Sequence, residues 1–90
     1  MITRREGIYW HEEDRDFGPF KLRLGGTRDF VSLIDPEDYR SSPPGRVELV
    51  EGWDNPRATL YPTMEGALAA ASQVWEIEGC HISVEATGDR

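Results

Sequence analysis

The sequence predicts an α+β fold: a mostly antiparallel β-sheet of about five or six strands, with one C-terminal helix packed on one face. Short runs of alternating polar and apolar residues recur from position 7 to position 61, and this period of two is typical of half-buried strands. One later stretch changes to helical spacing, and another short apolar run follows it. The 90 residues are expected to form a single domain, 1–90, with the element order β-β-β-β-β-α-β.

The first two strands are expected at residues 7–13 and 19–24, and turn residues 14–18 are expected to join them into a hairpin. In the second strand apolar side chains alternate with basic ones, which places the apolar ones on one face. Three further strands are expected before the helix, at residues 29–34, 46–51 and 57–61.

The helix is expected to begin at Pro62 and Thr63, because the threonine hydroxyl can accept a hydrogen bond from a free N–H of the first turn. Gly79 is expected to end it. One helical face carries the apolar residues Met64, Ala67, Leu68, Ala71, Val74 and Trp75. Residues 80–84 are then expected to return as the last strand of the sheet.

The composition favours a soluble protein that binds basic partners. Asp and Glu outnumber Lys and Arg by 17 to 10, for a net charge of −7. A charge of this sign repels nucleic acid and anionic membranes. The single cysteine, Cys80, excludes an internal disulfide and any multi-thiolate metal site, which fits a reducing cytoplasm. No signal peptide, membrane span or cofactor is expected.

The segment HEEDRDFG, from His11 to Gly18, concentrates one imidazole and four carboxylates in a few residues. A metal site would need ligands from elsewhere, such as His81 or Asp29, because strand alternation sends neighbouring side chains to opposite faces. Paired carboxylates for acid–base catalysis need burial, and carboxylates beside Arg15 at a turn are expected to be exposed. The sequence therefore favours a solvated hairpin end, with neither a metal nor a catalytic residue assigned.

The acidic residues form clusters, which gives a second interpretation of this charge. If two clusters shared a face, their carboxylates would resemble a phosphate backbone; otherwise the acidic surface serves solubility alone. Tyr39 and Trp53 lie in turns, where each either covers the edge of the core or anchors a partner. Further acids stand at Glu48, Glu51, Glu76 and Glu78. The residues predicted to bind a partner are Glu12, Glu13, Asp14, Asp16, Asp35, Glu37, Asp38, Tyr39, Trp53 and Asp54.

Two segments in the second half of the chain carry a family pattern. They are GRVELVEG, residues 45–52, and PTMEGALAAASQVW, residues 62–75. Residues 45–75 resemble the central part of small phage-encoded type I-F anti-CRISPR proteins. The resemblance implies a protein that acts by binding, and that obstructs a CRISPR surveillance complex or its nuclease at a basic surface that holds DNA. It implies no catalytic motif and assigns no contact to an individual residue.

The predicted function is therefore a non-enzymatic acidic inhibitor that binds a basic nucleic-acid-binding surface of a bacterial defence complex. Its carboxylates would act there as a mimic of DNA. Direct binding to nucleic acid or membrane is not expected. One alternative is an immunity protein or antitoxin that neutralises a basic toxin. Another is a small metal-dependent hydrolase that uses His11, His81 and nearby carboxylates. A monomer and a homodimer formed through an exposed strand edge both remain open.

Overall fold

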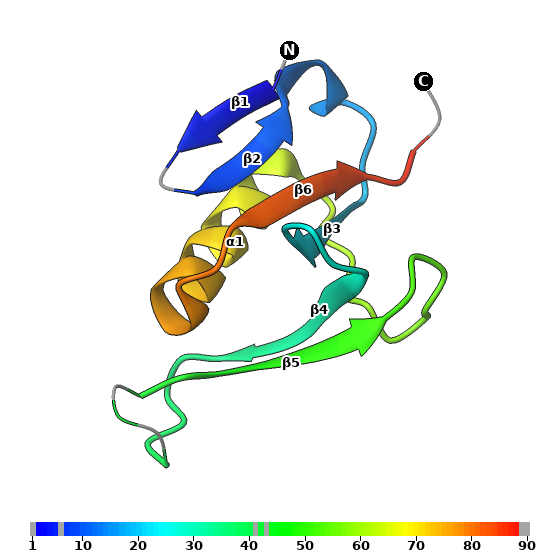
Figure 1. Ribbon diagram of the computed structural model, residues 1–90. Helices are drawn as coiled ribbons and strands as arrows, with labels where there is room; N and C mark the ends of the chain where they lie inside the picture. The colour runs from blue at the N-terminus through cyan, green and yellow to red at the C-terminus, as the bar shows by residue number, and fades with distance from the viewer. Residues whose placement is uncertain (1, 6, 41, 43, 89–90) are drawn as a thin grey trace.

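The computed structural model describes residues 2–5, 7–40, 42 and 44–88. Within them the chain forms six strands, one short 3-10 helix and one α-helix (Figure 1). Their bounds are β1 Ile2–Arg5, β2 Ile8–His11, η1 Glu12–Asp14, β3 Phe20–Leu24, β4 Asp29–Asp35, β5 Arg46–Glu51, α1 Met64–Glu78 and β6 Ile82–Ala86.

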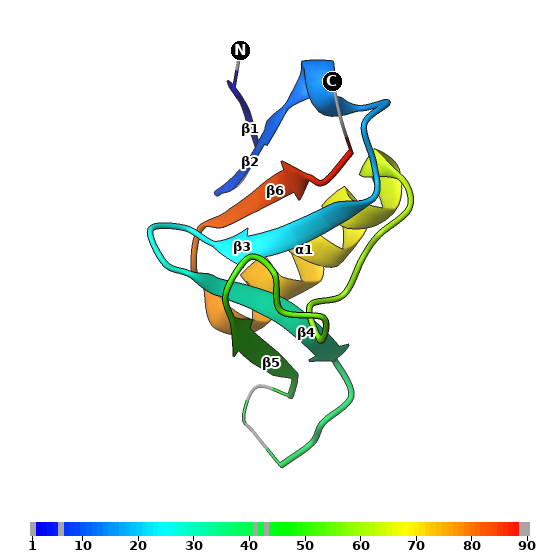
Figure 2. The same ribbon diagram turned by 90° about the vertical axis from the view of Figure 1, so that its right-hand side faces the viewer.

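The strands form one sheet in the order β1-β2-β6-β3-β4-β5. All neighbours are antiparallel except β2 and β6, which run parallel. The helix α1 lies across one face of this sheet (Figures 1 and 2). This arrangement confirms the predicted class, a mostly antiparallel sheet with one C-terminal helix, and the predicted order of element types, although the five strands before α1 include β1 in place of the strand predicted at residues 57–61.

The core lies between α1 and the sheet. On the sheet side the alternation predicted for β2 and β3 is confirmed, because Ile8, Trp10, Phe20 and Leu22 are all buried. The helix contributes small as well as large side chains, which lets its backbone lie close to the sheet. The buried helical residues are Met64, Ala67, Leu68, Ala70, Ala71 and Val74, so the predicted apolar face is confirmed except at half-buried Trp75.

Both predicted ends of the helix are confirmed. Thr63 is the N-cap, and its hydroxyl oxygen accepts a hydrogen bond from the N–H of Gly66 at 3.1 Å. Gly79 follows the last helical residue with φ of 70°, a left-handed conformation that glycine adopts at little cost. Its N–H donates to the carbonyl of Trp75 at 2.8 Å.

The hairpin predicted between residues 7–13 and 19–24 is wrong. Strand β2 ends at His11, and the chain continues as the 3-10 helix η1 instead of extending the strand to residue 13. The C-terminal strand β6 inserts between β2 and β3, with Ile82 opposite both Ile8 and Leu24. Because Ile82 and Val84 are buried, β6 gains more from a central position than from the sheet edge. The unpredicted strand β1 pairs with β2 on the other side.

The strand predicted at residues 57–61 is also wrong, for a geometric reason. Strands β3 and β4 pair only at Arg23 and Phe30 and then diverge. The segment enters the gap between them, where the N–H of Thr59 donates to Val31 and the backbones of Phe20 and Tyr61 exchange two bonds of 2.8 Å. An isolated bridge thus replaces a strand. The last strand runs from Ile82 to Ala86, two residues later than expected.

A helix that is long and apolar enough to cross a membrane does not occur in the described part of the chain. The only α-helix there has 15 residues.

Candidate functional site

The N-terminal acidic cluster lies on η1 and the turn after it, where its charges are already partly neutralised. Glu12 accepts hydrogen bonds from Arg15 Nε at 2.6 Å and from Trp10 Nε1 at 2.7 Å. These bonds, with Arg15 the larger cause, hold the pKa of Glu12 below its ordinary value. Arg15 also pairs with Glu65 at the start of α1. The cluster therefore ties η1 to the helix through Arg15.

Asp14 does not fit the expectation of a fully solvated turn, because it is only 3% exposed. A carboxylate buried to this extent is not available as a contact for a partner protein. Glu13, by contrast, is exposed and lies 3.4 Å from Nδ1 of His11. Asp16 is exposed and lines a shallow pocket of about 430 Å³ at the N-terminus of α1, together with Arg15, Gly18, Pro62, Thr63, Met64 and Glu65.

The two histidines do not lie together. His81 precedes β6 at the level of Gly7, and its ring packs against Tyr9 and Trp75 with centroid distances of 5.5 and 5.9 Å. His11 lies four residues further along the parallel strand, about 13 Å away at the rise of a β-strand. Among the residues that the structure describes, no three His, Cys, Asp or Glu side chains converge as metal ligands.

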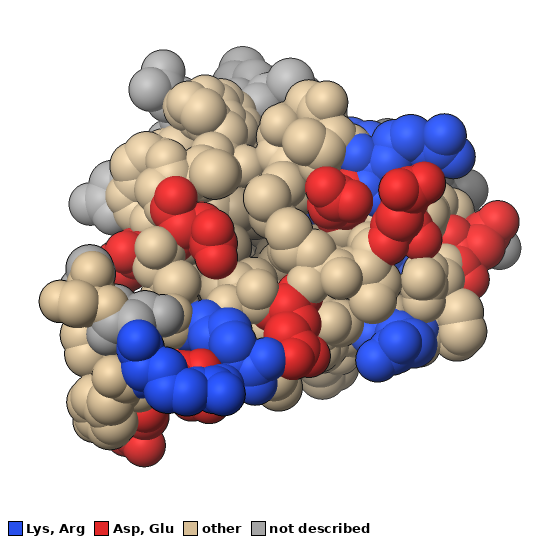
Figure 3. Space-filling view, turned by 60° about the horizontal axis from the view of Figure 1, so that its bottom comes forward, with Lys and Arg blue, Asp and Glu red and all other residues tan. Residues whose placement is uncertain are grey.

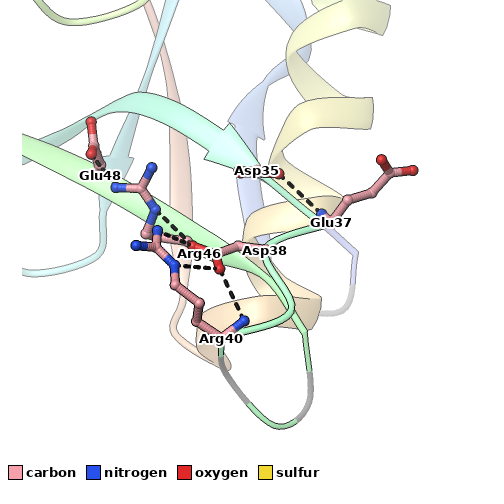
Figure 4. A network of polar contacts seen from close by, with 6 residues as sticks. All are labelled: Asp35, Glu37, Asp38, Arg40, Arg46 and Glu48. Carbon is pink, nitrogen blue, oxygen red and sulfur yellow. Dashed lines mark hydrogen bonds and ion pairs between the residues drawn. The ribbon is translucent and has the colours of Figure 1, made fainter.

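The second predicted cluster lies in the loop between β4 and β5, and Asp38 holds that loop together (Figure 4). Its carboxylate accepts bonds from the Nε, Nη2 and backbone N of Arg40 at 2.9, 2.7 and 3.1 Å, and lies 3.0 Å from Nε of Arg46. These contacts, the side chain of Arg40 first, hold the pKa of Asp38 below its ordinary value of 3.8. Asp38 is 7% exposed, so it braces the loop instead of meeting a partner.

We refer to the contacts of Asp38 with Arg40 and Arg46 as the clamp. Tyr39 lies between Asp38 and Arg40 and is the most exposed large apolar side chain described, at 76%. On the N-terminal side of Tyr39, the carboxylate of Asp35 accepts a hydrogen bond from the N–H of Glu37 at 3.1 Å. Across the loop, the carbonyl of Asp38 accepts a hydrogen bond from the N–H of Gly45 at 3.0 Å. Glu37 itself is exposed and directed away from the clamp (Figure 4). We refer to residues 35–40 and 44–46 as the tip loop, which presents an aromatic ring and a carboxylate on a braced backbone.

Trp53 combines the two roles considered for it. Its ring packs edge-to-face against Phe30, with centroids 5.6 Å apart, and Nζ of Lys21 lies 4.6 Å from its centroid. It nevertheless remains 44% exposed, so part of the ring is accessible to a partner. The neighbouring Asp54 is exposed.

The two predicted acidic clusters lie at opposite ends of the molecule. η1 is at the top of Figures 1 and 2, and the loop between β4 and β5 is at the bottom. They therefore do not combine into one row of carboxylates. Figure 3, seen from the side of β5, shows separate groups of Asp and Glu with Lys and Arg beside several of them.

Several accessible apolar residues near the sheet were not predicted from the sequence. Three leucines are partly exposed: Leu33 by 41%, Leu49 by 38% and Leu60 by 51%. Their apolar side chains gave no sign of this exposure in the sequence. The pairing of Asp38 with Arg40 has a local signal, since the two residues are two positions apart in a turn rich in Pro and Ser. The pairing with Arg46 has none, because it depends on how the loop closes.

Comparison with protein-family models, curated proteins and solved structures finds no match to this chain.

Proposed function

We propose that this protein is a non-enzymatic inhibitor that binds a basic, nucleic-acid-binding surface of a bacterial defence complex in the host cytoplasm. The tip loop is the contact surface, Tyr39 is its anchor and Glu37 is the carboxylate at its rim. The partner class, a type I-F CRISPR surveillance complex, comes from the resemblance carried by residues 45–75. The mode of binding comes from the geometry of the tip loop.

The braced tip loop is the observation that carries this proposal. An aromatic residue that is 76% exposed gains little for folding, whereas Tyr is enriched among the residues that dominate binding energy. The clamp of Asp38 with Arg40 and Arg46 fixes the backbone on both sides of Tyr39. A backbone segment that is already held by such contacts loses less conformational entropy on binding, so more of the contact energy appears as affinity.

The charge of the chain supports a basic partner. The net charge of −7 attracts the chain to a basic groove, which increases the rate at which the two meet. The same charge repels acidic proteins, so encounters with them are slower. Within the tip loop we assign this attraction to the carboxylate of Glu37. Among the described residues Glu37 forms no ion pair, whereas Asp38 is paired with two arginines. Glu12 and Asp14 contribute to the overall field but are engaged internally or buried.

Binding to a purified type I-F surveillance complex tests the proposal. The chain is expected to bind the immobilised complex, to compete with target DNA, and to associate more slowly as salt is raised. Glu37→Lys is expected to slow association more than Asp16→Lys, which makes the same change of charge at the far end of the molecule.

Two results would contradict this function. The first is an absence of binding to the complex and its nuclease at low salt. The second is binding that Asp16→Lys weakens and Glu37→Lys leaves unchanged, which would move the contact to η1. Tight binding to a basic nuclease toxin, with no binding to the complex, would instead identify the chain as an immunity protein.

A further inference from the structure

We propose that the free edge of β5 accepts an extended segment of the partner protein as an additional antiparallel strand. This inference rests on the proposed function and specifies how the partner is held beside the tip loop. The segment would carry an apolar residue opposite Leu49 and a basic residue opposite Glu51.

Strand β5 ends the sheet on one side, and no described segment pairs with its outer edge. In Figure 1 it forms the lower border of the molecule, continuous with the loop that carries Tyr39. The strand is six residues long and contains no proline, and the bulge between Val31 and Leu33 lies on β4. Edge strands are usually blocked by proline, bulges, short length or charged side chains. β5 carries charged side chains at Arg46, Glu48 and Glu51 but has none of the other three features, so its backbone can still pair.

Hydrogen bonds on either side show which backbone groups face this edge. The carbonyl of Glu48 accepts a bond from Oγ of Ser32, and the N–H of Gly52 donates to Arg28, so both point toward β4. Because N–H and C=O groups alternate in direction along a strand, those of Val47 and Leu49 point toward the open edge.

The Glu51 carbonyl at the end of this edge accepts a bond from Nδ2 of Asn55 at 3.1 Å. That bond closes the edge on one side. The available groups are therefore the N–H and C=O of Val47 and Leu49 and the N–H of Glu51.

The side chains along this edge define the chemistry of the incoming segment. Val47, Leu49 and Glu51 alternate with the others and share the helix side of the strand, since Val47 packs on the core and Leu49 is opposite Val31. Glu51 lies directly opposite Asp29, and like charges in this position destabilise a sheet. Neither carboxylate is ion-paired within the described residues. A cation added opposite Glu51 would relieve this repulsion.

A second copy of the chain suits this edge less well. Symmetric pairing centred on Glu48 or Leu49 would place Arg46 opposite Val50 or Gly52 of the other copy, and no cation opposite Glu51. It would also bring together two chains that each carry a charge of −7. The charge of the edge therefore favours a basic partner segment.

A synthetic peptide tests this inference without the whole partner. The probe is acetyl-Thr-Lys-Thr-Val-Thr-Val-Thr-amide, whose lysine would lie opposite Glu51 and whose two valines would lie opposite Leu49 and Val47. Its control replaces the lysine by glutamate. Amide NMR is expected to show shifts at Val47 and Leu49 and slower hydrogen exchange of their N–H groups, with binding of the control weaker by about tenfold.

Two matched changes separate strand pairing from side-chain contact. Leu49→Pro and Leu49→Ala both remove the leucine side chain, but only proline removes the N–H at the open edge, and the ladder to β4 does not use that N–H. Leu49→Pro is expected to bind the peptide about tenfold more weakly than Leu49→Ala. If Leu49→Pro does not fold, the unaltered protein is tested with the peptide N-methylated at the valine opposite Leu49, with the same expected loss.

Strand addition is overturned if the lysine peptide does not bind, if its shifts fall away from Val47 and Leu49, or if the proline and alanine variants bind equally. It is also overturned if the chain sediments as a dimer that Leu49→Pro dissociates, because a second copy then occupies the edge. Loss of binding to the surveillance complex in Tyr39→Ala, together with equal binding by the two Leu49 variants, would preserve the proposed function and reject strand addition. Peptide binding without binding to the complex would do the reverse.

Discussion

The carboxylate of Asp38 lies 3.0 Å from Nε of Arg46, and this contact joins the middle of the tip loop to the first residue of β5. Arg40, which lies within the loop, donates three hydrogen bonds to the same carboxylate, two from its side chain and one from its backbone N–H. One buried acid therefore orders the chain on both sides of Tyr39. The clamp connects the sheet, which supplies rigidity, to the exposed ring.

Asp38→Asn should loosen the tip loop and lower the stability of the fold at neutral pH. The substitution removes the negative charge that accepts two side-chain bonds from Arg40 and lies beside Arg46, which also pairs with Glu48. Charge-assisted bonds are among the stronger ones in proteins. We expect the melting temperature to fall by about 5 °C in a calorimetric scan. Asp54→Asn, at an exposed position, is the control and should leave it unchanged.

The difference between the native chain and Asp38→Asn should depend on pH in a defined direction. The folded pKa of Asp38 lies below its ordinary value of 3.8, so its stabilisation is fully present above about pH 4. It should be lost as the pH falls through the folded pKa. Thermal scans of both proteins from pH 7 downward should therefore run parallel and then converge in acid. A difference that persists in strong acid would show that the effect is not due to the charge.

Gly7→Ala should destabilise the protein more than Gly26→Ala. Both glycines have left-handed φ, 85° and 74°, so the backbone strain of an added Cβ is similar. At Gly7 the new Cβ would lie 2.6 Å from Cζ3 of Trp75, whereas at Gly26 it would meet nothing within 4 Å. We expect Gly7→Ala to cost about 1–3 kcal/mol more in urea unfolding. Equal costs would show that Trp75 moves aside freely.

Thr63→Ala should destabilise α1 by about 1 kcal/mol, because the N–H of Gly66 loses its acceptor. Thr63→Ser keeps the hydroxyl oxygen and should restore most of the loss. Urea unfolding of the three proteins measures both effects. If serine were as destabilising as alanine, the threonine methyl group and not the cap would be responsible.

Local patterns of the sequence were enough to predict the helix and the inward faces of the strands. Thr63 and Gly79 bound the helix through interactions with residues three or four positions away, and such short-range signals are visible in a sequence. The alternation of Phe20 and Leu22 similarly reports which face is buried without reporting which strand lies alongside.

The pairing of strands depended on contacts that local patterns do not contain. Ile82 takes a central position between Ile8 and Leu24, which are far from it in sequence, and this separates the hairpin expected at the N-terminus. Residues 57–61 have a strand-like pattern, but the divergence of β3 from β4 leaves them one bridge at Tyr61. Tertiary geometry overrides propensity in both cases.

The candidate site was predictable in part for the same reason. Glu37 was predicted as a contact residue, whereas Tyr39 was left open between covering the edge of the core and anchoring a partner. The structure leaves both accessible. Asp14 and Asp38 had the same apparent character in sequence, yet both are buried. Burial of a carboxylate depends on the cations and backbone groups that reach it, and for Asp38 one of these, Arg46, comes from the next strand.

The most direct test of the central claim is the affinity of Tyr39→Ala for a purified type I-F surveillance complex. Leu60→Ala is the control, since Leu60 is also a large apolar side chain, 51% exposed, outside the tip loop. We expect Tyr39→Ala to bind about 30-fold more weakly than the native chain, as for a residue that dominates an interface, and Leu60→Ala to bind normally. Equal affinity of Tyr39→Ala and the native chain, with both proteins folded, would contradict the claim that the tip loop is the binding surface.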